Sequence, residues 1–399
     1  MGTPGYLVAL GDECCGCGAC AASCGKDAVS MVADGWGFLH PEIDALACVG
    51  CGVCEKACPA LSKIAEDGIE SVHWAKASDA DLKERSSSGG VFGLIAREVL
   101  RDGGVVVGAA FTDDCKSVEH IIVESEETLD SVMRSKYVQS SVDFDVYEGV
   151  RSALRAGRRV VFSGTACQVA GMRGYLGSLA NSPLFVSVDV ICHGVPSPKL
   201  WSDWVEYLNT CAGAEIRCVN FRSKTTGWLS YSVSYSYETE KDGAMRQSAD
   251  KFADDWYMRA FLNNASLRAS CFDCPCKRSC GSDITLGDFW GFQTIHPEVD
   301  YSKGVSAVIC NTGEGVALLD ALADKLDIGV SSLREVLPGN SSLVGSVPIY
   351  EHRGEFMSDV AKGDLSLMLE KWTFEPTVFQ RIGGHLTRVK HLLKRIIGA

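Results

Sequence analysis

The sequence lacks the features that would place the chain in a membrane or send it out of a reducing compartment. Its beginning, MGTPGYLVALGDECC, has no charged start followed by a long apolar run and a small-residue cleavage site. No stretch reaches the roughly 18 uninterrupted apolar residues of a membrane span. Basic residues are scarce too, because 38 Lys and Arg face 51 Asp and Glu, a formal net charge of −13. This balance argues against a nucleic-acid partner, since phosphate binding needs a basic face.

Cysteine, by contrast, is abundant, with 19 in 399 residues. We expect a cytoplasmic protein, because clustered thiols in a reducing compartment bind metal rather than form disulfides. The length gives room for two or three domains, and the hydrophobic fraction of 46% is typical of a globular protein.

Two stretches in the first sixty residues follow one spacing rule, C-x2-C-x2-C-x3-C. Bacterial two-cluster ferredoxins use this run, and the fourth Cys of each run ligates the other cluster. A pair of zinc sites is the alternative, but a zinc ribbon needs two C-x2-C pairs rather than two runs of four. The rule assigns cluster one to Cys14, Cys17, Cys20 and Cys58, and cluster two to Cys48, Cys51, Cys54 and Cys24. Cys15 is surplus and is interpreted as a packing residue.

The rest of the chain mixes strand and helix patterns. We expect an amphipathic helix over Val91–Arg101, ended by Gly103 and Gly104, and a buried strand over residues 105–111. Further strands are expected within residues 158–165, 184–194, 228–237, 282–291 and 304–310, and further helices within 166–176 and 196–210. The predicted class is a mixed α/β or α+β fold. Its parts are a ferredoxin-like domain over residues 1–62, a larger mixed-sheet flavin domain over 70–345 and a helical tail over 346–399.

Three local features of the large part suit a cofactor. The Ser86–Gly90 loop opens a helix, where free backbone N–H groups bind phosphate and Gly allows a close approach. The alternative is a plain Ser N-cap. The SGTACQ turn at Gly164 and Thr165 repeats this geometry. The SKYVQS segment offers Lys136 and Tyr137, a cation and an aromatic ring, although such a pair is often just surface.

A third set of cysteines lies in the same part of the chain. SCFDCPCKRSCGSD places four of them within ten residues, and Cys167 and Cys192 follow two predicted strands. Four thiolates of this pool can close a third cluster. A zinc knuckle built from the local four alone is the alternative. The local four are Cys271, Cys274, Cys276 and Cys280.

Six motifs occur in one order and together resemble a known family. They are RSSSGGVFGLIA, SKYVQS, SGTACQVAGMRGYL, ICHGVPSPKL, FRSKTTGW and SDITLGDFWG. Over roughly residues 10–345 the chain resembles the beta subunit of coenzyme F420 hydrogenase/dehydrogenase, in its bacterial form with an N-terminal two-cluster ferredoxin-like domain. The resemblance implies FAD, a further [4Fe–4S] cluster near it, and electron exchange with ferredoxin or another redox protein.

The resemblance also implies site residues. Its recurring cysteines match Cys167, Cys192, Cys271 and Cys274, which we prefer as ligands of the third cluster. The family's turn usually reads G-T-P-C-Q, whereas residue 166 is Ala here, and Cys276 and Cys280 are extra to the pattern, so they stay alternative ligands. The expected flavin-binding residues are Ser87, Ser88, Gly89, Gly90, Ser135, Lys136, Tyr137, Gly164, Thr165, Gln168 and Gly194.

His193 is the candidate catalytic residue. It follows Cys192 directly, and its unperturbed pKa near neutrality suits donation of a proton to a reduced substrate. A hydrogen bond to the flavin or to a cluster sulfur is the alternative. Arg222 and Asp288 are placed near the site by the resemblance alone, and Trp290 is interpreted as a core residue.

These parts predict an oxidoreductase that joins one-electron clusters to a two-electron, small-molecule substrate through a flavin, which handles both. The first alternative is an electron-transfer subunit of a larger redox complex. The second is a protein that oxidises reduced coenzyme F420. The sequence leaves the substrate, the electron donor and the direction of flow open.

The end of the chain has its own pattern. From Arg381 to Ala399 there are five Lys or Arg and no acid, and apolar residues recur at helical spacing. One interpretation is a helix packed on its own domain. The other is a basic amphipathic helix that lies on anionic lipid or docks an acidic partner, with about 1 kcal/mol per Lys or Arg near the surface.

Overall fold

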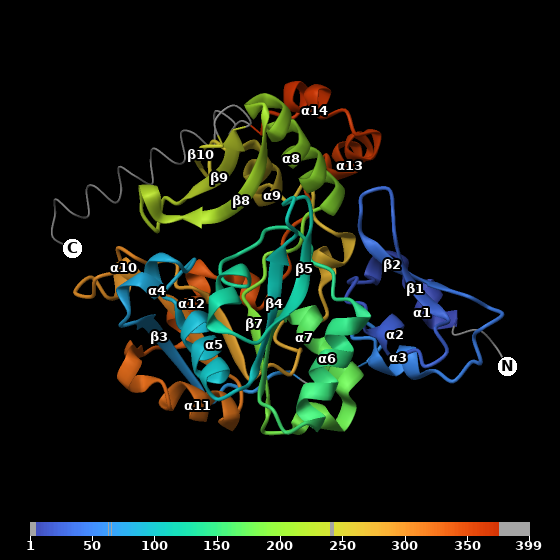
Figure 1. The fold of residues 1–399 in the computed structure, drawn as a ribbon, viewed down its shortest axis with the longest axis horizontal. Helices are drawn as coiled ribbons and strands as arrows, with labels where there is room; N and C mark the ends of the chain where they lie inside the picture. The colour runs from blue at the N-terminus through green and yellow to red at the C-terminus, as the bar shows by residue number, and fades with distance from the viewer. Residues whose placement is uncertain (1–4, 63, 65, 240–242, 375–399) are drawn as a thin grey trace.

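The computed structural model describes residues 5–62, 64, 66–239 and 243–374. Its centre is an eight-stranded mixed sheet with the order β13-β3-β12-β11-β7-β6-β4-β5 (Figure 1). The four inner strands β11, β7, β6 and β4 run parallel, and all other pairs are antiparallel. The strands are β3 Ser71–Ala77, β4 Val105–Phe111, β5 Val118–Val123, β6 Val160–Thr165, β7 Phe185–Val190, β11 Ile284–Asp288, β12 Ser306–Cys310 and β13 Leu326–Val330.

Helices cover both faces of this sheet, because alternate residues of its strands are apolar on each side. Val106 and Val161 pack on α5 Val91–Arg101 and α11 Gly313–Asp320, while Val107 and Phe162 pack on α6 Phe144–Arg155 and α7 Ala166–Leu176. Shorter elements follow the rim. They are α4 Ala80–Glu84, the 3₁₀ helix η2 Glu126–Ser131, the 3₁₀ helix η5 Ala269–Asp273, α10 Phe292–Ile295 and α12 Leu333–Val336.

A second layer lies across one end of the large sheet, at the upper left in Figure 1. Its three-stranded antiparallel sheet has the order β10-β9-β8, and its aromatic core contains Trp201, Trp204, Phe221 and Tyr257. Residues from the C-terminal helices α13 and α14, such as Phe356, join this core. The elements are α8 Pro198–Ala212, β8 Ala214–Ser223, β9 Ser232–Thr239, β10 Met245–Lys251, α9 Trp256–Leu262, α13 Arg353–Lys362 and α14 Leu365–Lys371.

The N-terminal domain is small and stands against α6 and α7, at the right in Figure 1. Its hairpin pairs β1 Val29–Ala33 with β2 Leu39–Ile43, and its helices are α1 Gly5–Ala9, α2 Ala19–Ala22 and α3 Val53–Ala57. Arg268 of the large part is 2% exposed and donates to the carbonyls of Cys14 (2.6 Å) and Leu39 (2.8 Å). The two parts are therefore joined through buried polar contacts.

The predicted mixed α/β class is confirmed. The helix over Val91–Arg101 and the strand over residues 105–111 have the predicted bounds. The predicted strand over 228–237 begins later, at Ser232, because Trp228 turns inward and donates to Asp288 (2.7 Å). The predicted domain limits stay a prediction, and residues 375–399 lie outside the described residues. Within the described ranges, no helix combines the length and apolarity needed to cross a membrane.

Candidate functional site

The first ferredoxin-like set converges on one small cavity. Cys14, Cys17, Cys20 and Cys58 line a space of about 10 Å³, together with Leu7, Leu10 and Met31. Burial raises the pKa of Cys20 to about 12, and binding of a metal would displace this proton because the thiolate is the ligand. The fourth cysteine of the second run thus joins the first three of the first run, as the ferredoxin rule predicts.

The second set lies at the outer side of the same domain. Gly18 and Gly52 hold equivalent left-handed positions in the two runs, each just before the short helix that carries the third cysteine. Cys54 is close enough to Cys24 for their charges to interact. Ala28 N–H donates to the Cys24 sulfur (3.3 Å). This arrangement is consistent with Cys24 as the fourth ligand of cluster two.

Four dispersed cysteines line a second cavity of about 40 Å³ in the large part. Cys167 lies in the first turn of α7, and Cys192 follows β7. Cys271 lies in η5, and Cys274 follows it. The N–H of Val195 donates to the Cys271 sulfur (3.4 Å). Burial raises the pKa of Cys192 to about 12. The chain therefore brings together the four cysteines that the family resemblance implied.

The local alternative ligands are placed differently. Cys276 and Cys280 are each 1% exposed and do not line this cavity. A hydrogen bond from Cys276 lowers the pKa of Cys274 to about 6, and the Cys280 thiol donates to Asp67 (3.5 Å). Among the described residues, no three His, Cys, Asp or Glu side chains are grouped for a single metal ion. The geometry favours Cys167 and Cys192 over Cys276 and Cys280.

Cys15 has a place that the sequence reasoning missed. It lines both the cluster-one cavity and the cavity of Cys167, and its thiol hydrogen-bonds to Cys167 and Cys17. The sequence hinted at this role only through the position of Cys15 directly after Cys14. Adjacency alone does not show which way the Cys15 side chain points. Cys15 is therefore a wall residue between two cysteine cavities rather than simple packing.

A much larger cavity, of about 750 Å³, opens where the parallel strands β4, β6, β7 and β11 end. Ligands of open α/β sheets bind at this edge of the sheet. The second layer supplies the opposite wall through β8, α9 and the loops that precede β9 and follow β10. Of the predicted flavin-binding residues, all but Gly89 line this cavity, namely Ser87, Ser88, Gly90, Ser135, Lys136, Tyr137, Gly164, Thr165, Gln168 and Gly194.

The hydroxyls of the Ser86–Gly90 loop bond within the protein, so the donors available to a ligand are backbone amides at the start of α5. Ser86 donates to Leu82 O (2.7 Å), Ser88 donates to Val305 O (2.9 Å), and Ser87 accepts from Ser135 N–H (2.8 Å). These hydroxyls thus hold the loop in place. The first amides of α5 have no helical partner, and Val91, Phe92 and Gly93 line the cavity, so they are the free donors.

Gly89 has a packing role. A Cβ there would lie 2.4 Å from the Ala75 carbonyl oxygen of β3 and 2.9 Å from the Ser306 nitrogen, so only Gly lets the loop touch the sheet. Its own carbonyl accepts from Ala77 N–H (2.7 Å). Gly90 has φ +87°, which also favours Gly. Substitution of Gly89 would therefore damage the fold before it tested a cofactor.

The second turn, at the start of α7, is closed by its own side chains. Gln168 accepts from the Thr165 N–H and hydroxyl (3.0 Å each) and donates to the Ser140 hydroxyl (2.9 Å). This capping box occupies the groups that the sequence suggested as free. Thr165 and Gln168 therefore fix the turn and tie it to the 135–140 segment, while Gly164 leaves space beside it.

Lys136 is half-buried, with its ammonium turned to the Ser131 and Met133 carbonyls (2.7 and 2.6 Å). Burial lowers its pKa to about 7. Two of its three donors are thus used by the preceding turn. Tyr137 stacks on Phe261 with ring centroids 5.0 Å apart. Both residues line the cavity, but their main contacts are with the protein.

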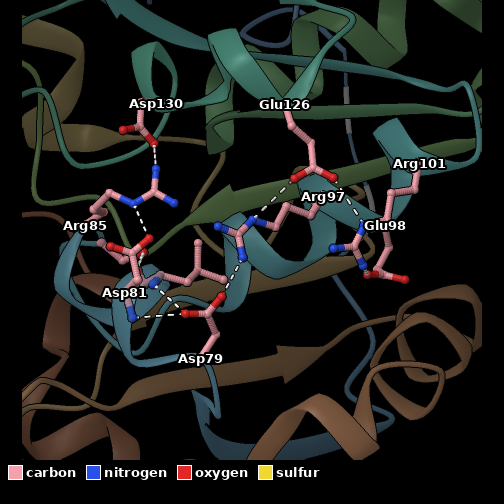
Figure 2. A network of polar contacts seen from close by, with 10 residues as sticks. Asp79, Asp81, Arg85, Arg97, Glu98, Arg101, Glu126 and Asp130 are labelled. Carbon is pink, nitrogen blue, oxygen red and sulfur yellow. Dashed lines mark hydrogen bonds and ion pairs between the residues drawn. The ribbon is translucent and has the colours of Figure 1, made fainter.

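Ion pairs connect α4, α5 and η2, the elements around the Ser86–Gly90 loop (Figure 2). Asp79 caps α4 and pairs with Arg97 of α5 (2.7 Å), and Arg97 also faces Glu126 of η2 (3.8 Å). Arg85 joins α4 to Asp130 (2.5 Å). The network connects the helices on both sides of the loop to the segment that leads to Ser135. Each exposed pair contributes little alone, but the network orients the loop.

The opposite wall holds a buried ion pair. Arg222 donates to both oxygens of Asp288 (2.7 and 3.0 Å), and its guanidinium lies over the rings of Tyr231 (4.0 Å) and Trp290 (4.9 Å). The Asp288 charge outweighs burial and raises the pKa of Arg222. Trp290 is half-buried and stacks on Trp228, so it belongs to the cavity wall as well as the core.

His193 lines both the third-cluster cavity and the large cavity. Asn264 donates its amide to Pro348 O (3.0 Å), so its oxygen accepts from His193 Nε2–H (2.6 Å). This network leaves Nδ1 as the unprotonated nitrogen of the neutral ring. Burial lowers the pKa of His193. The neutral ring therefore presents a hydrogen-bond acceptor rather than a proton.

The two cavities share a wall. Residues 190–195, which follow β7, line both of them, and Cys192 and His193 lie in this segment. Cys15 links the smaller cavity to that of cluster one. The cluster-one cavity, the cavity of Cys167 and the large cavity are thus connected in series by shared wall residues.

Two family descriptions match the chain. Residues 157–336 match the C-terminal part of the coenzyme F420 hydrogenase/dehydrogenase beta subunit, and residues 13–61 match the 4Fe-4S dicluster domain. A coenzyme F420-dependent sulfite reductase from Methanocaldococcus jannaschii is 29% identical over 172 residues, which cover 40% of this chain and 24% of that protein. The chain thus spans about a quarter of that relative. Ferredoxin-3 from Rhodobacter capsulatus is 35% identical over 78 residues, covering 14% of this chain and 77% of that protein.

Among solved structures, a chain of the F420-reducing [NiFe] hydrogenase complex from Methanosarcina barkeri aligns with a TM-score of 0.45. It is 16% identical, and the alignment covers 78% of this chain and 94% of that chain.

Proposed function

Because the chain belongs to the coenzyme F420 hydrogenase/dehydrogenase beta-subunit family and carries a 4Fe-4S dicluster domain, we propose that it is an iron–sulfur flavoprotein oxidoreductase. Its clusters exchange electrons with a redox protein, and FAD in the large cavity exchanges two electrons with a small-molecule substrate. A flavin supplies this chemistry because it handles both one and two electrons.

The shared wall is the observation that carries this proposal. Residues 190–195 separate a cavity lined by four cysteines from a cavity large enough for a dinucleotide. Cys192 and His193 both line the two cavities, so a candidate ligand thiol borders the cofactor space directly. No protein layer other than this segment needs to be crossed between them.

The cavity fits FAD by its donors. The open amides at the start of α5 suit the pyrophosphate, because a helix N-terminus carries partial positive charge. Lys136, whose pKa is about 7, has one donor left when it is protonated, and a bound pyrophosphate would favour that charged form. The apolar and aromatic side chains suit the ring system, since cofactor sites are mostly apolar with a few placed polar groups. Such wall residues are Val190, Leu229, Tyr231, Phe252, Phe261 and Trp290.

We assign His193 a positioning role in this site. Its Nδ1 can accept a hydrogen bond from the cofactor, while Asn264 holds the ring at Nε2. A proton-donor role would require protonation of Nδ1, which burial disfavours at neutral pH. Replacement of His193 by Gln, which keeps a donor toward Asn264, should retain FAD better than replacement by Leu.

The test is an anaerobic purification followed by a search for electron partners. Flavin absorbance near its visible maximum reports reduction when ferredoxin or reduced coenzyme F420 is added, and small acceptors are then screened for reoxidation. Cys192→Ser should remove four iron atoms, keep the N-terminal clusters and slow flavin reduction by the redox protein. Loss of iron from Cys276→Ser or Cys280→Ser instead would reject the ligand assignment.

A further inference from the structure

The outer side of cluster two exposes a group of apolar side chains. Leu46 is 99% exposed, Val49 is 48% exposed and Val53 is 45% exposed. Cys51, which lies between Val49 and Val53, is also exposed. We name Leu46, Val49, Cys51 and Val53 the cluster-two face. Single exposed apolar residues are ordinary, but several within eight positions around a ligand thiol mark a contact surface.

The charge around this face has one sign. Residues 5–62 contain seven carboxylates, two lysines and no arginine, a net charge of −5. Glu42 and Asp44 are exposed just before Leu46, and Asp44 accepts from the Leu46 N–H (2.8 Å). The apolar face therefore lies beside fixed negative charge, and Lys56 is the exposed cation of the second run.

We propose that the cluster-two face docks a one-electron carrier protein whose own contact patch is apolar and ringed by Lys and Arg. The inference rests on the proposed function, because it needs a cluster at Cys48, Cys51, Cys54 and Cys24. Of those four thiols, Cys51 is the exposed one. Redox encounters use small interfaces, for which a few apolar contacts and complementary charge suffice.

Charge decides between this partner and two other occupants. A second copy of the chain would bring an equally negative face against this one, which like-charge repulsion disfavours. An acidic ferredoxin meets the same repulsion. The basic residues 381–399 have the right charge, but they lie outside the described residues, so their place on this face is a matter for the experiment.

The experiment measures the rate at which the photoreduced holoprotein reduces cytochrome c, a basic one-electron haem protein, across a series of salt concentrations. Leu46→Ser and Val49→Lys are the test variants. Ile349→Ser and Val330→Lys are their matched controls, because Ile349 is 66% exposed and Val330 is 80% exposed and both belong to the large part of the chain. Reduction of methyl viologen and the iron content are measured on every variant.

We expect each face variant to slow cytochrome c reduction by about tenfold, the equivalent of about 1.4 kcal/mol of binding free energy. The two controls should keep the wild-type rate, and the wild-type rate should fall with salt. Iron content and methyl viologen reduction should stay unchanged in all four, which separates docking from cluster loss. A wild-type protein without clusters would reject the proposed function instead.

Three kinds of result would overturn the docking proposal. The first is kinetic: either the face and control variants have equal rates, or the reaction is faster with an acidic ferredoxin than with cytochrome c. The second is a dimer in sedimentation that Leu46→Ser dissociates, which would assign the face to a second copy. The third is a chain ending at residue 374 that reacts faster and no longer responds to Leu46→Ser, which would assign the face to residues 375–399.

Discussion

Cys15 is the residue whose side chain most directly tests the proposed line of cofactors. It lines two cysteine cavities but is surplus to both ligand sets. We predict that Cys15→Ala keeps the full iron content and slows flavin reduction through the N-terminal domain, because the contact between the cavities is lost. Stopped-flow absorbance and iron analysis measure both. If the variant loses four iron atoms, Cys15 is a ligand and the assignment above is wrong.

Ser87 offers a sharper test of the flavin loop than its glycines. Ser87→Asp keeps an acceptor for the Ser135 N–H but adds a negative charge beside the amides of α5. We predict that it weakens FAD binding by at least about 1.4 kcal/mol, or tenfold, since phosphate and carboxylate then compete for the same field. Ser87→Asn, the neutral isostere, should bind FAD like the wild type. Equal FAD affinity in both variants, measured by ultrafiltration, would reject the loop's role.

At the scale of elements, α13 and α14 share an apolar core and two carboxylates of α13, Asp359 and Glu355, that pair with Lys371 of α14. Asp359 is the more buried of the two. Asp359 accepts from Lys371 (2.7 Å), Lys362 (2.9 Å) and the Trp372 indole (3.0 Å). The Lys371 ammonium first, and then Lys362, hold the pKa of Asp359 well below its usual range. This stabilisation is present above the unfolded pKa of about 3.9 and is lost as pH falls toward the folded value.

We predict that Asp359→Asn lowers the local opening free energy of α13 and α14 by about 2 kcal/mol at pH 7, because hydrogen bonds to a charged group are lost. Amide hydrogen exchange in these helices measures the change. The difference from the wild type should shrink below about pH 4. The comparison variant is Glu355→Gln, which removes the other carboxylate that pairs with Lys371 (2.7 Å). It should change the opening free energy little, because the Glu355 side chain is 59% exposed. A pH-independent difference would show that the charge is not the cause.

Elements with one strong pattern were predictable from the sequence. Val91–Arg101 has an apolar stripe and a Gly stop, and residues 105–111 form a continuous apolar run, so their bounds agree with the structure. The cysteine spacing likewise predicted which thiols meet in the first cavity, because a short loop fixes their geometry.

Side-chain partners were not predictable, because they depend on segments far apart in the chain. The Ser86 and Ser88 hydroxyls donate to the carbonyls of residues 82 and 305, so these donors are not free for a ligand, and Ser87 accepts from Ser135. Lys136 likewise donates to the Ser131 carbonyl of the preceding turn, a contact that the sequence did not indicate. The contact of Cys15 with Cys167 forms only where the N-terminal domain meets the large part, so the sequence could not indicate it.

At the scale of the whole molecule, the N-terminal domain docks on a flat face of α7. A Cβ at Gly174 would lie 2.5 Å from the Ala57 carbonyl oxygen, and one at Gly171 would lie 2.8 Å from the Cys17 sulfur. These glycines let the cluster-one cysteines approach α7, whose first turn carries Cys167.

We predict that Gly174→Val separates the two parts while both keep their cofactors, so iron content is unchanged and flavin reduction by the redox protein becomes slow. Small-angle X-ray scattering should show an expanded molecule. Gly354→Val is the matched control, because nothing lies within 4 Å of a Cβ there. A compact Gly174→Val protein with a normal rate would show that the interface tolerates the change and that α7 contact is not required.

The central claim is that one chain holds three four-iron clusters in line with a flavin. Iron and acid-labile sulfide, counted per chain in the anaerobically purified protein and in Cys192→Ser, test it most directly. The account predicts about twelve of each in the wild type and about eight in Cys192→Ser, with FAD present in the wild type. About eight of each in both proteins, or bound zinc without labile sulfide, would contradict it.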